Sequence, residues 1–131
     1  MQKLGKVKIK KLYERCVNLA RRKPPEFFLF KKLRGADGIC DWDSDDITLD
    51  PRGEVLATSY HELIHYLEPD WSETQVMYAE SRLRNNLTYL EHARFLKYIA
   101  IKLYKSELQR HILNRPKRKK KKNVKTAKNK K

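Results

Sequence analysis

The chain has 131 residues, 40% of them hydrophobic, and carries 31 Lys and Arg against 16 Asp and Glu. This length and apolar content are enough for one compact domain but not for two. No apolar run of membrane-spanning length is present, and residues 1–8 lack the apolar stretch of a signal peptide, so we expect an intracellular protein. Cys16 and Cys40 are not spaced like zinc ligands, which predicts free thiols.

The charges divide the chain into three segments. Residues 1–34 contain twelve Lys and Arg against two acids, residues 35–114 contain eight against fourteen, and residues 115–131 contain eleven and no acid. The basic excess therefore lies at the two ends, and the middle of the chain is acidic. An acidic segment is a favourable environment for a divalent cation and for a cationic or polar substrate.

The first predicted element is a helix over residues 6–22. Apolar residues recur there at intervals of three and four, with Lys and Arg between them, and Pro24-Pro25 ends the pattern. A basic outer face is typical of a solvated helix, and the alternative is a helix that lies on nucleic acid.

Three short strands are expected next, over residues 26–33, 39–42 and 47–50. The first is aromatic and precedes the turn sequence Gly35-Ala36-Asp37-Gly38, and an acidic turn separates the second from the third. Because turns separate consecutive strands, we expect a three-stranded antiparallel meander. Together with the helices, it predicts an α+β domain.

The sequence His61-Glu62-Leu63-Ile64-His65 lies in the next predicted helix and is an H-E-x-x-H motif. On a helix the two histidines lie one turn apart on one face, so both imidazoles can bind one metal ion. Zn²⁺ accepts two imidazoles and a carboxylate and keeps one position for water. Glu62 would take a proton from that water as the general base.

The third metal ligand is expected from the following helix. Ser72 and Gln75 form a capping box, so a helix begins there, and the short corner before it folds this helix back beside the motif. Glu73 and Glu80 lie seven residues apart on one face, so either can complete the site. We favour Glu73 because it lies at the corner close to His65, and Glu80 is the alternative.

A long helix and a basic segment end the chain. Thr88 and Glu91 form a second capping box, and the apolar spacing predicts a helix of about twenty-five residues that covers the sheet. We assign residues 1–114 to one domain and residues 115–131 to a disordered polybasic tail. We expect the tail to bind nucleic acid rather than a membrane, because no amphipathic face or lipidation signal accompanies it. A solubilising or localisation segment is the alternative.

The order of these elements resembles a minimal zincin metallopeptidase, of the kind found in small bacterial and phage SprT-like and ImmA-like proteins. The resemblance covers roughly residues 26–87, and H-E-x-x-H is its specific part. It implies a Zn²⁺ cofactor held by His61, His65 and Glu73, with Glu62 as the catalytic residue and a protein or peptide as substrate. The chain departs from metzincins, which continue the motif to a further His, and from SprT-like proteins with a Cys zinc ribbon.

Three functional hypotheses remain open. The first is a zinc-dependent hydrolase, most simply a peptidase, and the second is a non-catalytic zincin-fold binding or regulatory protein that associates with nucleic acid through its basic ends. The third is a structural nucleic-acid-binding domain in which the motif is accidental. Metal content separates the third hypothesis from the other two.

A hydrolase would also need a hydrogen-bond donor that stabilises the oxyanion of the tetrahedral intermediate. No spacing rule selects this donor among Tyr60, Tyr66 and Tyr78.

Overall fold

The computed structural model describes residues 4–50 and 52–114, and the predicted polybasic tail lies outside them. These residues form an α+β protein, as predicted. Its helices and strands, in chain order, are α1 (Lys6–Arg22), β1 (Phe28–Phe30), β2 (Gly38–Asp41), β3 (Asp46–Leu49), α2 (Val55–Leu67), α3 (Glu73–Asn86) and α4 (Tyr89–Leu113), with a 3-10 turn (Pro25–Phe27) before β1. None of the described helices is long and apolar enough to cross a membrane.

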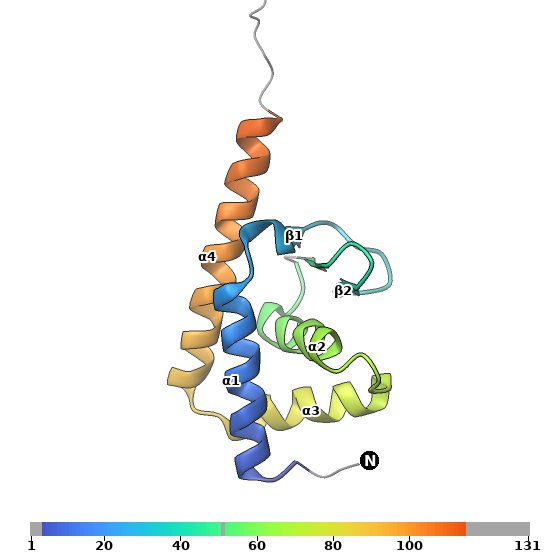
Figure 1. The fold of residues 1–131 in the computed structure, drawn as a ribbon, viewed down its shortest axis with the longest axis vertical. Coiled ribbons are helices and arrows are strands. Elements are labelled where there is room, and N and C mark those ends of the chain that lie inside the picture. The colour runs from blue at the N-terminus through green and yellow to red at the C-terminus, as the bar shows by residue number, and fades with distance from the viewer. Residues whose placement is uncertain (1–3, 51, 115–131) are drawn as a thin grey trace, which may run out of the picture.

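Helices α1 and α4 run side by side in the same direction and form the long axis of the molecule (Figure 1). The Tyr13 hydroxyl in the middle of α1 donates a hydrogen bond to the Glu91 carbonyl near the start of α4, at 2.7 Å. Towards the other end, the Lys102 ammonium donates to the carbonyls of Ala20 and Arg21, at 3.0 and 2.7 Å. The predicted extents of both helices are confirmed, at 17 and 25 residues.

The sheet has the strand order β1-β3-β2. Strands β2 and β3 are antiparallel, but β1 pairs with β3 in parallel, with Phe28 opposite Ile47. The predicted antiparallel meander is therefore wrong, and the sheet is mixed. Ile47 and Leu49 are fully buried, because β3 is the central strand.

The segment between β1 and β2 explains this order. The Leu33 amide donates to the Asp50 carboxylate at 2.9 Å, and the Asp50 amide donates to the Asp37 carbonyl at 2.8 Å. Asp50 directly follows β3, so these bonds hold residues 31–37 across the end of the central strand. The chain thereby reaches the far side of β3 instead of closing a hairpin beside β1.

Both predicted capping boxes are formed. In α3 the Gln75 amide donates to Ser72 Oγ at 3.2 Å, and the Ser72 amide donates to Gln75 Oε1 at 2.8 Å. Thr88 and Glu91 make the same reciprocal pair at the start of α4. Each pair satisfies amides that a helix start leaves without partners, so the residue at which α3 begins is defined.

Helix α2 lies at the centre of the fold, between the sheet and α3 (Figure 1). Its Tyr60 ring stacks on Phe95 of α4, with the ring centroids 4.1 Å apart. It is α2 that packs on β2 and β3, whereas the main contact of α4 with the sheet is to β1, where Ser106 Oγ donates to the Phe28 carbonyl. The expected covering of the sheet by the last helix is thus made chiefly by α2.

Candidate metal centre

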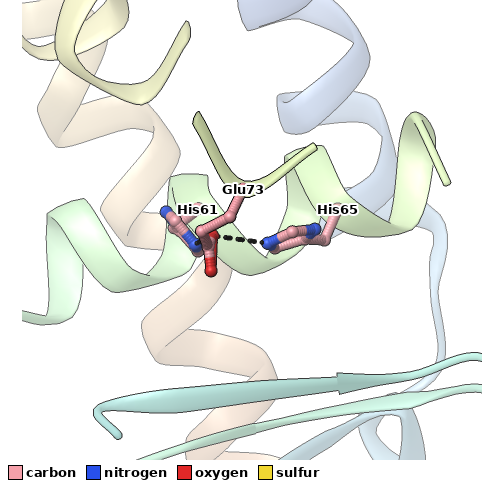
Figure 2. Close-up of side chains that lie close together, drawn as sticks. All are labelled: His61, His65 and Glu73. Carbon is pink, nitrogen blue, oxygen red and sulfur yellow. Dashed lines mark hydrogen bonds and ion pairs between the residues drawn. The ribbon is translucent and has the colours of Figure 1, made fainter. Parts of the chain in front are cut away.

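Two histidines and one glutamate converge where α2 meets the start of α3. Each offers one ligand atom, and these atoms lie within 4.8 Å of one another. Glu73 Oε1 is 2.6 Å from His61 Nε2 and 2.9 Å from His65 Nε2, and its side chain reaches between the two rings (Figure 2). The i, i+4 spacing on α2 and the capping box at Ser72 are the local causes of this arrangement.

The chemistry of this donor set fits Zn²⁺. Two ligands bound tetrahedrally to zinc at about 2.1 Å are about 3.4 Å apart, so the Glu73 oxygen lies somewhat closer to the imidazoles than in a metal complex. The Glu73 side chain is 63% exposed and can withdraw by that amount without disturbing the core. Hydrogen bonds with His65 and His61, together with their charges, lower the pKa of Glu73, which favours the carboxylate that a metal requires.

Glu80, the alternative third ligand, lies against the other nitrogen of His61. Its Oε1 is 3.1 Å from His61 Nδ1, and Arg84 Nε donates to its Oε2 at 2.7 Å. A proton shared with Glu80 at Nδ1 leaves the Nε2 lone pair free to bind a metal. In this arrangement Glu73 faces both Nε2 atoms, and Glu80 orients one of the rings.

Glu62, the predicted catalytic residue, is 7% exposed and opens onto a cavity of about 660 Å³ that His61 and Glu73 also line. Its carboxylate forms no hydrogen bond with any residue in the described part of the chain. Burial raises the pKa of Glu62, and the nearby His61 and His65 partly oppose that shift. A raised pKa makes the carboxylate a stronger base, which suits it to accept a proton.

Gly38, at the start of β2, is a site residue that sequence reasoning missed. A Cβ atom at this position would lie 2.7 Å from Thr58 Cγ2 and 2.8 Å from Glu62 Cγ. The absence of a side chain therefore lets β2 lie directly against the Glu62 side chain. A glycine within a strand often marks such a close approach, but the sequence placed Gly38 in the turn before the strand, so this signal was not recognised.

The three candidate oxyanion donors have other partners. The Tyr60 hydroxyl lies 3.0 Å from His92 Nδ1 in the core, the Tyr66 hydroxyl donates to Asp45, and the Tyr78 hydroxyl accepts a bond from the Leu4 amide. The structure therefore aims none of these three hydroxyls at the metal ligands.

Comparison of the chain with protein families, with curated proteins and with solved structures gave no match. The resemblance to zincins therefore remains a prediction. A functional assignment has to rest on the residues of the site themselves.

Proposed function

We propose that the protein is a zinc-dependent metallohydrolase that cleaves peptide bonds. One observation carries the proposal: three atoms of His61, His65 and Glu73 that can bind a metal converge beside Glu62, which is 7% exposed and forms no hydrogen bond with the described residues. A buried acid without a hydrogen bond is destabilising, so a protein is expected to keep one chiefly where it serves function. The H-E-x-x-H spacing assigns the two roles, with histidines as ligands and Glu62 as the base.

Zn²⁺ bound to these ligands would polarise a substrate carbonyl and lower the pKa of a water molecule. Glu62 accepts a proton from the attacking water, whose oxygen forms a bond to the carbonyl carbon. As the carbon–nitrogen bond breaks, Glu62 returns the proton to the leaving nitrogen. One water is consumed, and the products are a carboxylic acid and an amine. Glu80 contributes by holding the His61 ring through Nδ1.

Metal content and a base-deficient variant together test the proposal. The purified chain, reconstituted with zinc, should hold about one Zn²⁺ per molecule by elemental analysis. Glu62→Gln should keep the metal and lose at least about a hundredfold in cleavage of an unstructured protein such as casein, because it removes the base and spares the ligands. The matched control Glu26→Gln changes an exposed glutamate before β1 and should leave both quantities unchanged.

The outcomes separate the competing hypotheses. A chain that binds no zinc even after reconstitution would contradict the metallohydrolase assignment and favour an accidental motif. A chain that binds zinc but cleaves nothing, with Glu62→Gln indistinguishable from it, would favour the non-catalytic regulatory protein.

A further inference from the structure

The cavity beside the candidate metal centre extends well beyond the metal ligands. It has a volume of about 660 Å³ and lies between residues 35–38, the N-terminal half of α2 and one face of α3. This volume falls within the range of sites that bind a small ligand or a substrate side chain with its flanking backbone. Because Glu62 and His61 line the same cavity, whatever fills it lies next to the reacting position.

The lining of this cavity is strongly acidic. Of the described residues that line it, five are Asp or Glu, and Arg84 is the only Lys or Arg. That arginine is already paired with Glu80 at 2.7 Å. Glu73 and Glu80 contact His61, so both are occupied by the candidate metal centre.

Two carboxylates of the lining, those of Asp37 and Glu54, belong to no ion pair within the described residues. Asp37 is held in place: its carbonyl accepts the Asp50 amide, and its carboxylate lies against Gly53, where a Cβ atom would come within 2.9 Å of Asp37 Oδ1. Both acids are exposed and line the cavity, so their carboxylates are accessible to a ligand.

A second observation points to a ligand at the same place. Glu62 is 93% buried, opens into this cavity and has no hydrogen-bond partner in the described chain. Ala57 and Met77 add apolar surface to the lining. A lysine or arginine side chain combines an apolar stem with a cationic tip, which matches a lining that is partly apolar and partly acidic.

We propose that the cavity binds a lysine or arginine side chain of the substrate, adjacent to the bond that is cleaved. Asp37 and Glu54 pair with the cationic group, and the residues of α2 and α3 contact its stem. This specificity rests on the proposed peptidase function. It excludes substrates that place an acidic residue at the same position, because like charges would meet in the cavity.

Matched peptides test the proposal. Each is a nine-residue alanine–serine peptide carrying a fluorophore and one central residue, either lysine or norleucine, which has the same stem without the charge. The zinc-reconstituted protein should cleave the lysine peptide with a kcat/KM roughly tenfold or more above the norleucine peptide. Mass spectrometry of the products should place the cut at one fixed distance from the lysine.

Removing the charges of Asp37 and Glu54 tests whether the preference for lysine arises in the cavity. In the double variant Asp37→Asn/Glu54→Gln, the lysine-to-norleucine ratio should fall towards one. The control Asp43→Asn, in the exposed turn between β2 and β3, should keep the ratio of the unaltered protein. A ratio near one in the unaltered protein, or a ratio that the double variant leaves intact, would overturn the proposal.

Binding of the same peptides separates this proposal from the proposed function. Fluorescence anisotropy with the Glu62→Gln protein measures affinity without turnover. Tighter binding of the lysine peptide, weakened by salt, supports the cationic cavity even if the protein hydrolyses nothing. Equal binding of the two peptides overturns it even if the protein is an active peptidase.

Discussion

The α1–α4 pair and the α2–α3 corner differ in how their charged groups are paired. Along α1 and α4, Lys10 pairs with Glu91, Arg94 pairs with Glu14, and the Lys102 ammonium binds carbonyls at the end of α1. At the α2–α3 corner, Glu62 is buried and pairs with none of the described residues, and the exposed Glu73 bridges two histidines.

The difference indicates which region was shaped by stability and which by chemistry. The Lys10–Glu91 and Arg94–Glu14 pairs lie at the surface, so they change the free energy of folding little. The corner retains a desolvated carboxylate and clustered metal-binding atoms, an arrangement that lowers stability and is typical of functional sites. Substitutions in the two regions should therefore produce different kinds of loss.

The largest effect on folding is expected in the long pair. Leu103 of α4 is 2% exposed, and Leu103→Ala should lower the free energy of unfolding by about 2–5 kcal/mol, because it removes buried methyl groups and leaves a cavity. Leu108→Ala, on the same helix but 42% exposed, should cost under about 1 kcal/mol. Urea unfolding measures both, and equal losses would contradict this account of the core.

A substitution at Gly38 should affect stability and the site together. Gly38→Ala places a methyl group against Thr58 and Glu62, and overpacking of this kind costs about 1–3 kcal/mol. We also expect it to reduce turnover, because the Glu62 side chain has to move. Gly5→Ala is the control, since a Cβ atom there would have nothing within 4 Å. If Gly38→Ala unfolds and turns over like the unaltered protein, the close approach of β2 is not needed.

A smaller effect, confined to metal binding, is expected at Glu80. Glu80→Gln weakens the interaction with His61 Nδ1 and should lower zinc affinity about 10–100-fold, whereas Glu73→Ala, which removes the proposed direct ligand, should lower it further. Competition with a chelating dye measures the affinities, with Glu14→Gln on α1 as the control. If Glu80→Gln lowers zinc affinity more than Glu73→Ala does, Glu80 is the direct ligand and Glu73 is the partner of the histidines.

The smallest effect is a change in the pH dependence of stability. Hydrogen bonds from Arg52 and from the Leu33 amide hold the pKa of Asp50 well below its usual range, so its contribution is fully present above the unfolded pKa of about 3.9 and is lost as pH falls below it. Asp50→Asn should therefore be less stable than the unaltered protein at pH 6, with a smaller difference at pH 3. Thermal unfolding at both pH values tests this, and exposed Asp70→Asn should show neither difference.

Sequence reasoning succeeded where the signal was local. The extents of α1 and α4 and both capping boxes follow from spacing within a few residues. It failed where distant segments meet. The parallel pairing of β1 with β3 depends on how Asp50 holds the segment 31–37, and the place of Gly38 depends on α2 packing under β2. Neither interaction leaves a periodic pattern in the sequence.

The short separation of the three proposed ligands along the chain has a thermodynamic consequence. His61, His65 and Glu73 all lie within thirteen consecutive residues, so the entropy lost in closing the chain around a metal ion is small even when the rest of the protein is unfolded. The denatured ensemble would then retain some affinity for zinc, and binding to that ensemble reduces the stabilisation that mass action gives the native state. Zinc should thus raise the melting temperature by less than its native-state affinity alone predicts.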